Sequence, residues 1–303
     1  MVIVRLKGGV GNQMFLYAIG RHLSIRNKTP LKLDLTYLKL NKQRNYELKY
    51  FNINAKVIPL LFGSTIPSRI FFKTFKILSK ILKKRSLYPR QKNYYFDKEI
   101  LDMKVFILDD YWTSENYFKD ISETIKKEFT LKDNLNKENE FMLKKIIGSN
   151  SICIHLRRGD VTPGSKRAKK VGKAFSLDYY KNSIKLIEKK VKNPYFFVFS
   201  DGIEWAKKNF KINSPTVYVD INGPDEGSKD LNLMKHCKHF IIASTFSWWA
   251  AWLSENKDKI ILASKVWFNP LEKNEIPKNT KKKWPYIRDE GDIIPKRWIR
   301  VED

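Results

Sequence analysis

Cysteine is scarce in this sequence, which has only Cys153 and Cys237 among 303 residues. Both lie in apolar segments, so we expect inert buried thiols; two cysteines make neither a disulfide framework nor a zinc-binding spacing. No uncharged segment is as long as a membrane span. Nothing at the amino terminus resembles a signal peptide, because Arg5 and Lys7 interrupt the only apolar run there. We therefore expect a protein of the reducing cytoplasm.

Acidic residues are also in short supply: 32 Asp and Glu stand against 59 Lys and Arg, for a net charge of +27. Such an excess must face nucleic acid, an anionic membrane or a phosphorylated ligand, and charge alone does not choose among them. A nucleic-acid surface would interleave aromatic and basic residues on an exposed sheet. The strands of the second half of the chain look buried on both faces, so we expect no nucleic-acid partner.

The length and hydrophobic content predict two α/β domains. A chain of 303 residues is long for one core, and 42% hydrophobic residues allow two cores to be buried. A polar stretch at 132–137 and a turn at 148–150 place the boundary, which gives an N-terminal domain at 1–148 and a C-terminal domain at 149–303. We expect Trp267 to Asp303, rich in Pro and Trp, to be an extended segment that wraps the surface.

The second half alternates short apolar runs with amphipathic stretches, which predicts a doubly wound parallel sheet. Its expected strands and helices alternate throughout, as Ile152–Leu156, Leu177–Lys190, Tyr195–Ser200, Ile203–Phe210, Thr216–Asp220, Lys229–His236, Phe240–Ala243, Phe246–Ser254 and Ile260–Ala263. The first half is less regular. Its expected elements are strands at Val2–Leu6, Leu31–Leu35 and Val105–Asp109, and helices at Asn12–Arg26, Arg69–Lys84, Glu115–Phe129 and Asn136–Ile146.

The segment Ser151–Asp160 joins a buried strand to two arginines. The strand ends at Leu156, and Arg157 and Arg158 follow directly. Ligands collect beyond the carboxyl ends of strands in open α/β sheets. An arginine there can present a planar fork of donors to phosphate oxygens. The alternative is an arginine-rich turn that pairs with nearby acids, and the segment by itself does not separate the two.

A glycine-rich loop, Lys7–Gln13, lies between the first expected strand and helix. Glycines there let a backbone pass close to a ligand. The loop is not the dinucleotide fingerprint, because Met14 takes the place of the third glycine, and it is not a P-loop, because no Gly-Lys-Ser/Thr follows. It is either a tight turn or a binding loop in which Asn12 and Gln13 offer uncharged groups suited to sugar hydroxyls.

Two later segments also put polar side chains after strands. Asp201 follows the strand at 195–200, where its carboxylate either accepts from the nitrogens of guanine or caps the next helix. Ser244 and Thr245 stand between the strand at 240–243 and a helix with three tryptophans. Hydroxyls and N–H groups at a helix start suit a phosphate, whereas the tryptophans have the spacing of core residues.

The expected helix Arg69–Lys84 is basic and amphipathic. It either packs an apolar face on the core with its lysines in water, or lies on an anionic membrane. The apolar face consists of Phe71, Phe75, Leu78 and Leu82, and the basic stripe beside it of Arg69, Lys73, Lys76, Lys80 and Lys83.

The motifs at Gly8–Phe15, His155–Asp160 and Thr245–Trp249, in this order and spacing, resemble the bacterial α-1,2-fucosyltransferase family. Asp230–Met234 and Cys237–His239 add to the resemblance, which covers essentially the whole chain. It implies a GT-B type glycosyltransferase, with two Rossmann-like domains facing across a cleft. It further implies inverting transfer of L-fucose from GDP-β-L-fucose to the 2-hydroxyl of a terminal β-galactosyl residue of a glycan.

Carried onto this chain, the family's motifs imply roles for individual residues. Arg157 would hold the nucleotide phosphates with His155 beside it, and Asn12 would approach the reacting sugar from the other domain. Asp160 would shape the arginine loop and is a candidate base for the acceptor proton. The nucleotide-binding residues that the resemblance implies are Gly9, Gly11, Arg158, Asp201, Ser244, Thr245, Phe246 and Ser247.

The chain has no Asp-x-Asp pair to clamp a diphosphate through a metal. We therefore expect arginine and helix-start amides to stabilise the leaving group, with no metal and no cofactor. The expected partners are GDP-fucose and a galactose-terminated oligosaccharide or glycolipid of a cell-surface polysaccharide, with the enzyme cytoplasmic or peripheral on the inner membrane face. Ala243 and Gly202 depart from the family's motifs, so another GDP-sugar donor, or a catalytically weakened glycan-binding relative, stays an alternative.

Overall fold

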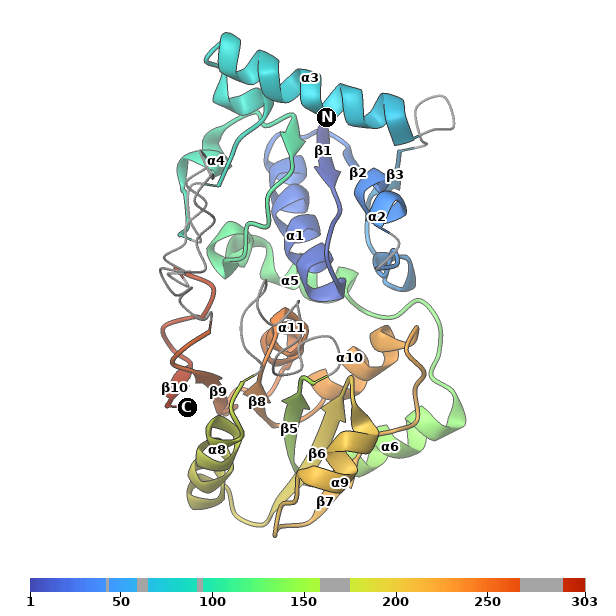
Figure 1. Cartoon of the computed structure of the whole chain (residues 1–303), viewed down its shortest axis with the longest axis vertical. Coiled ribbons are helices and arrows are strands. Elements are labelled where there is room, and N and C mark those ends of the chain that lie inside the picture. The colour runs from blue at the N-terminus through green and yellow to red at the C-terminus, as the bar shows by residue number, and fades with distance from the viewer. Residues whose placement is uncertain (42–43, 59–64, 92–94, 159–174, 268–290, 303) are drawn as a thin grey trace, which may run out of the picture. The chain divides into compact units, whose positions relative to one another are not determined.

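The computed structural model describes residues 1–41, 44–58, 65–91, 95–158, 175–267 and 291–302 (Figure 1). The chain divides into two compact units, Met1–Asp133 with Gly291–Pro295, and Asn134–Glu290 with Lys296–Asp303. Helix α6 (Lys137–Ile147), which the sequence analysis placed before the domain boundary, packs with the second unit.

The first unit is built on a parallel sheet with the strand order β3-β2-β1-β4. Its central strand β1 pairs Val2 with Leu31 on one side and Ile3 with Ile107 on the other. The strands are β1 (Val2–Arg5), β2 (Leu31–Asp34), β3 (Lys56–Val57) and β4 (Ile107–Leu108). The α-helices are α1 (Val10–Arg26), α2 (Thr36–Asn41), α3 (Thr65–Ile81), α4 (Glu99–Asp102) and α5 (Ser122–Glu128), and the 3-10 helices are η1 (Leu48–Tyr50), η3 (Arg85–Leu87), η4 (Glu115–Tyr117) and η5 (Lys119–Ile121).

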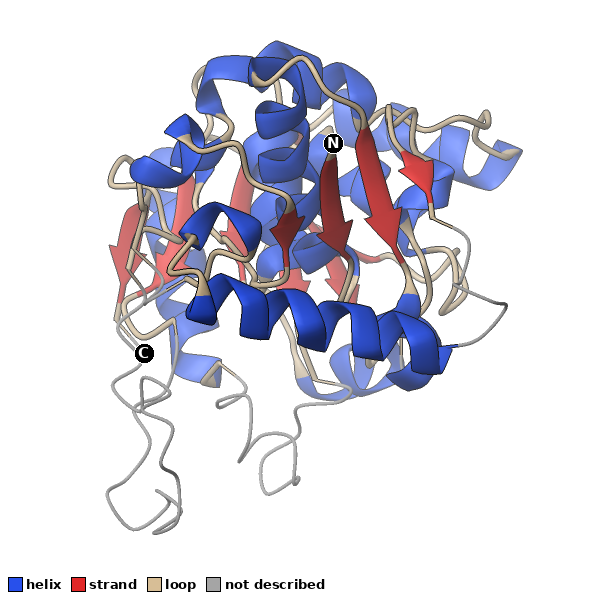
Figure 2. Ribbon diagram, turned by 90° about the horizontal axis from the view of Figure 1, so that it is seen from above, coloured by secondary structure: helices blue, strands red, loops and turns tan. Residues whose placement is uncertain are grey.

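Helices cover both sides of this sheet (Figure 2). Helix α1 is buried along most of its length, and Gly20 lets it lie against β1, because a Cβ at Gly20 would stand 2.4 Å from Val4 Cγ2. Helix α3 packs Phe72 in a cluster with Ile3 and Ile107. The close packing of α1 on β1 fixes the glycine-rich loop that joins them.

A buried carboxylate ties α5 to α1. Glu128 accepts hydrogen bonds from the hydroxyl of Tyr17 and, at 2.8 Å, from Nε of Arg21. The Tyr17 hydroxyl also accepts from the N–H of Asn54 at 2.8 Å. Burial, followed by the adjacent carboxylate, raises the pKa of Tyr17, so the phenol stays protonated and donates. Glu128 thus joins α5 to α1, and the Tyr17 hydroxyl extends the network to the segment of Asn54.

The second unit has a parallel sheet with the strand order β10-β9-β8-β5-β6-β7. The predicted doubly wound sheet is confirmed: successive strands run outward from β5 on one side and from β8 on the other. Ser151 to Leu156 of β5 are all buried, as expected of a central parallel strand. The strands are β5 (Asn150–Leu156), β6 (Pro194–Ser200), β7 (Thr216–Tyr218), β8 (His239–Ile242), β9 (Ile261–Ser264) and β10 (Ile299–Val301), and the helices besides α6 are α8 (Leu177–Lys190), α9 (Ile203–Asn209), α10 (Gly227–Lys235) and α11 (Thr245–Leu253).

Two predicted elements differ from the structure. The single helix expected at 115–129 is wrong: η4, η5 and α5 replace it, because Tyr117 and Phe118 are both fully buried and Phe118 has an extended φ of −146°. The expected wrapping segment from Trp267 is wrong at its end, where Ile299–Val301 pairs with β9 as strand β10. Residues 268–290 of that segment lie outside the described residues.

Within the described ranges, no helix combines the length and apolarity needed to cross a membrane.

Candidate functional site

The strand order of the second unit reverses between β5 and β8, and this topological switch point carries the candidate site. In doubly wound sheets, ligands bind outside the carboxyl ends of the strands at such a point. His155 and Arg157 lie at the end of β5, and Ser244 follows the end of β8. Residues that are far apart in the sequence are therefore brought together, since 89 positions separate His155 from Ser244.

A capping box at the start of α11 holds the ring of His155. Its Nδ1 lies 3.1 Å from the Oγ of Ser244 and 3.1 Å from the Oγ of Ser247. Ser244 Oγ accepts from the N–H groups of Phe246 and Ser247, and Ser247 Oγ accepts from those of Ala243 and Ser244. Two of the three hydroxyls predicted to bind the nucleotide, those of Ser244 and Ser247, therefore already bind the helix start and the histidine. Thr245 and Phe246 are the half-buried residues of this turn, and the Phe246 ring stands edge-on to His155 at 5.6 Å.

Tyr180 of α8 fixes the backbone on which Arg157 stands. Its hydroxyl donates to the carbonyl of His155 at 3.1 Å and accepts from the N–H of Arg157. Burial raises the pKa of Tyr180, so the hydroxyl keeps its proton and both bonds. Arg157 itself is half-buried. A rigid backbone at the strand end reduces the conformational entropy that its guanidinium would lose on binding an anion.

Arg158, unlike Arg157, makes its contacts with the segment that follows β6. Its N–H donates to Asp201 Oδ1 at 2.6 Å, and its guanidinium carbon lies 3.6 Å from the centre of the Trp205 ring on α9. This contact joins the end of β5 to the segment after β6. Arg158 and Asp201 are thus brought together at the predicted edge, where one carboxylate oxygen of Asp201 already binds protein.

The histidine of this site is neutral at physiological pH. Burial lowers the pKa of His155 to about 4; Asp201 acts in the opposite direction and the Arg157 charge lowers it further. An imidazole that stays neutral offers one N–H donor and one acceptor, and takes no part in proton transfer near pH 7.

The predicted residues of the glycine-rich loop lie in the first unit. Gly8 has a φ of +76°, and a Cβ on it would stand 2.6 Å from Nδ2 of Asn12, so glycine is needed for the loop and for the place of Asn12. Gly9 is the N-cap of α1, and Gly11 is buried in the first turn. The suggestion that Gln13 binds sugar hydroxyls is wrong: Gln13 is fully buried and bonds Gly8, Asn45 and Glu47 at 2.8–3.1 Å.

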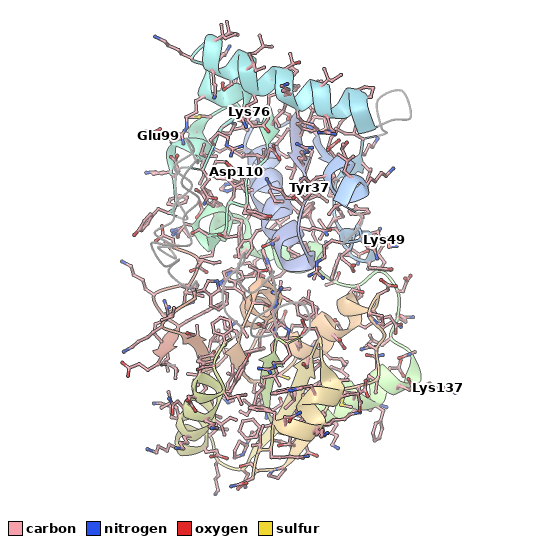
Figure 3. The ribbon with its side chains drawn as sticks, in the orientation of Figure 1. Tyr37, Lys49, Lys76, Glu99, Asp110 and Lys137 are labelled. Carbon is pink, nitrogen blue, oxygen red and sulfur yellow. The ribbon has the colours of Figure 1, made fainter. Side chains whose placement is uncertain are left out.

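Sequence reasoning missed a charged cluster at the carboxyl edge of the first sheet. Lys7, after β1, lies 3.3 Å from Asp109, after β4, and Arg5 lies 3.5 Å from the same carboxylate. Burial raises the pKa of Asp34 and of Asp110, whose side chain Figure 3 labels. The strand-end rule used for Arg157 would have found Asp109 and Asp110, since the strand expected at 105–109 runs straight into them.

Asp160, the predicted loop residue and candidate base, lies outside the described residues. Within the part of the chain that the structure describes, no group of three or more His, Cys, Asp and Glu residues could hold a metal ion.

The second unit thus combines an arginine, a neutral histidine and a helix start beyond the carboxyl ends of two central strands. Arginine side chains and helix starts of this kind are suited to anionic ligands. Two units built on parallel sheets, with such a site at the switch point of the second, are the architecture of GT-B type glycosyltransferases.

Comparison with known proteins identifies the family. The model of Glycosyl transferase family 11 matches residues 1–288, and the chain belongs to this family. It is 31% identical to an alpha-1,2-colitosyltransferase of Escherichia coli, over 100% of this chain and 99% of that protein. It is 33% identical to the O-antigen biosynthesis glycosyltransferase WbnK of Escherichia coli, over 89% of this chain and 96% of that protein.

More distant matches agree with this assignment. Over 50% of this chain and 43% of that protein, identity is 30% to galactoside alpha-(1,2)-fucosyltransferase 1 of Leontocebus fuscicollis. Among solved structures, FUT1 of Arabidopsis thaliana in complex with GDP superposes with a TM-score of 0.50 at 13% identity, over 86% of this chain and 69% of that chain. The last likeness concerns the fold alone.

Proposed function

We propose that this enzyme transfers L-fucose from GDP-β-L-fucose to the 2-hydroxyl of a terminal β-galactosyl residue of a glycan, with inversion and without a metal ion. The observation that supports this most is the placement of Arg157 and His155 beside the start of α11 at the switch point of the second sheet. The relatives named for α-1,2 transfer support the linkage.

In this mechanism the second unit stabilises the leaving group. Breaking the bond between fucose and phosphate places negative charge on the GDP diphosphate. The guanidinium of Arg157 stabilises that charge by donating paired N–H hydrogen bonds to the phosphate oxygens. The acceptor hydroxyl attacks the anomeric carbon from the face opposite the diphosphate, which gives inversion, and its proton passes to a base, for which Asp160 is the candidate from the sequence. Asn12, close to Gly8 in the first unit, carries an uncharged donor and acceptor suited to sugar hydroxyls.

A second candidate keeps the same chemistry with another donor sugar. The colitosyltransferase of Escherichia coli matches the whole chain, so a colitosyl donor is the alternative to fucosyl. The two donors place the same kind of diphosphate at Arg157 and differ only in the sugar that is transferred.

Purified enzyme with a β-galactoside acceptor and each nucleotide sugar in turn tests the proposal. We expect GDP release from GDP-fucose that depends on the acceptor, a product whose linkage by NMR is α-1,2, and unchanged turnover in EDTA. Faster transfer from the colitosyl donor would replace fucose in the proposal. Loss of activity in EDTA that Mg²⁺ or Mn²⁺ restores would overturn metal independence.

We further propose that α3 docks on an anionic membrane, where lipid-linked glycans are found. Of the predicted apolar face, Phe71 and Phe75 pack against the core, but Leu78 is 36% exposed and Leu82, past the end of the helix, 60%. Ile70, Ile77 and Ile81 are also exposed, so large apolar side chains and cations share one surface. The exposed cations are Arg69, Lys73, Lys80, Lys83 and Lys84.

Liposome sedimentation checks the docking. We expect binding to vesicles with anionic lipid and little to neutral ones, since each basic residue near the surface contributes roughly 1 kcal/mol. Ile77→Glu combined with Ile81→Glu should abolish it. Phe141→Glu on α6 is the control, because Phe141 is 70% exposed but lies outside the proposed surface. Equal binding to neutral and anionic vesicles would exclude the proposal.

A further inference from the structure

The capping box of α11 determines which nitrogen of His155 carries its proton. A serine hydroxyl can accept two hydrogen bonds and donate one. Ser244 Oγ already accepts from two backbone N–H groups, those of Phe246 and Ser247. Ser247 Oγ likewise accepts from the N–H groups of Ala243 and Ser244. Neither hydroxyl has a lone pair left for a proton on Nδ1.

The two hydroxyl protons complete the arrangement. Ser247 donates to the carbonyl of Ser244 at 3.2 Å, which leaves the proton of Ser244 to be donated to His155 Nδ1, 3.1 Å away. Nδ1 is then the acceptor, and the ring proton resides on Nε2. In the other tautomer, Nδ1–H would face two serine oxygens that already accept two hydrogen bonds each. The hydroxyl proton of Ser244, which is nearly buried, would then have no acceptor. An unmade bond to a buried group disfavours that tautomer by about tenfold or more.

We propose that His155 is a catalytic residue that donates a hydrogen bond from Nε2–H to an oxygen of the leaving diphosphate as an uncharged group, and that Ser244 is the positioning residue that sets this tautomer. This inference rests on the proposed function. Among the described residues Nε2 has no hydrogen-bond partner, so its donor is available to a ligand. As a neutral donor, His155 transfers no proton, and the diphosphate leaves with the charge that Arg157 neutralises.

Burial and the neighbouring charges together keep the ring of His155 neutral over the physiological pH range. Burial is the main cause that lowers the pKa of His155. Asp201, which follows β6, raises this pKa, and Arg157, which follows β5, lowers it, with a result of about 4. Tyr180 of α8 binds the carbonyl of His155, and the side chains of α11 at the ring, Ser244, Phe246 and Ser247, carry no charge. The ring is therefore neutral, with its proton on Nε2, at every pH above about 5, and the rate has no acid limb from His155 near pH 6.5.

Two substitutions of His155 distinguish the role of Nε2 from that of Nδ1. The amide of glutamine reaches the position of Nε2, and the amide of asparagine only that of Nδ1. His155→Gln should retain turnover within about tenfold, whereas His155→Asn should lower kcat by roughly 10²–10³-fold, the usual effect of losing one preorganised donor. We expect the affinity for GDP to fall about tenfold to a hundredfold in His155→Asn, as for a lost bond to a charged group, and less in His155→Gln. Equal losses in the two variants would overturn the proposal.

Nitrogen-15 NMR reads the tautomer directly in the full-length protein, with GDP as the probe. His155, assigned by comparison with His155→Gln, should show the Nε2–H pattern, should not titrate between pH 5 and 8, and should shift at Nε2 on addition of GDP. Ser244→Thr, which keeps the hydroxyl, should preserve the pattern, whereas Ser244→Ala should lose it and lower kcat. An Nδ1–H pattern, or titration near pH 6.5, would refute the assignment. Absence of sugar transfer by the wild-type enzyme would instead refute the proposed function and leave the tautomer standing.

Discussion

Replacing Arg157 by lysine is expected to lower kcat for sugar transfer by at least about 10²–10³-fold, which corresponds to about 2.7–4 kcal/mol of transition-state stabilisation. Lysine keeps the positive charge but presents a point charge on a flexible stem, whereas the guanidinium offers a planar fork that matches two phosphate oxygens. The backbone of Arg157 is anchored by Tyr180, so the strand end itself should not move. KM for the donor should change less than kcat, since the charge on the diphosphate develops in the transition state.

Steady-state kinetics with both substrates varied, together with the thermal midpoint, measure this effect. Arg26→Lys is the matched control: Arg26 forms an ion pair with Asp102 at 2.5 Å, both side chains are at least half exposed, and the pair lies in the first unit. That variant should turn over normally. Wild-type turnover in a folded Arg157→Lys enzyme would remove this arginine from the mechanism.

Replacing Glu128 by alanine is expected to lower the free energy of unfolding by about 3–5 kcal/mol, because removing one partner of a buried ion pair leaves the other charge uncompensated. Arg21 would lose its partner, with its side chain only 16% exposed. The fully buried hydroxyl of Tyr17 would lose its acceptor at the same time. α1 carries the glycine-rich loop at its start, so activity should fall together with stability.

Urea denaturation followed by circular dichroism gives this free energy. Glu123→Ala in the same helix is the control, because Glu123 pairs with Lys126 at 2.8 Å while its own side chain is 84% exposed. Exposed pairs of this kind contribute about 0–1 kcal/mol. Similar losses in the two variants would show that the buried network contributes little to the stability of the first unit.

The sequence predicts the second sheet well because its central strands are buried on both faces and read as continuous apolar runs. Arg157, Asp201 and Ser244 could be assigned to one sheet edge for the same reason, since each directly follows such a run. The pattern does not show which strands are neighbours. The pairing of β5 with β8, which brings Ser244 to His155, depends on the order of strands in space.

Other features leave too little local signal. Strand β3 consists of the exposed Lys56 and Val57, and β10 of three residues, so neither has an alternation to detect. A glutamine that clamps a loop cannot be told from one that binds a sugar until its partners are known, and Gln13 proved to be the former. The apolar residues of α3 have helical spacing throughout, but the packing partners end before Leu78.

The pairing of β1 with β4 affects how the first unit folds. Ile3 can meet Ile107 only after more than a hundred intervening residues have been synthesised. Closing so long a loop costs chain entropy before any contact between the strands can offset it. Until then one edge of the apolar strand β1 lacks its neighbour, and an unpaired strand edge is a template for association with other chains. The nascent protein therefore passes through a stage in which one edge of its earliest strand is open to association with other chains.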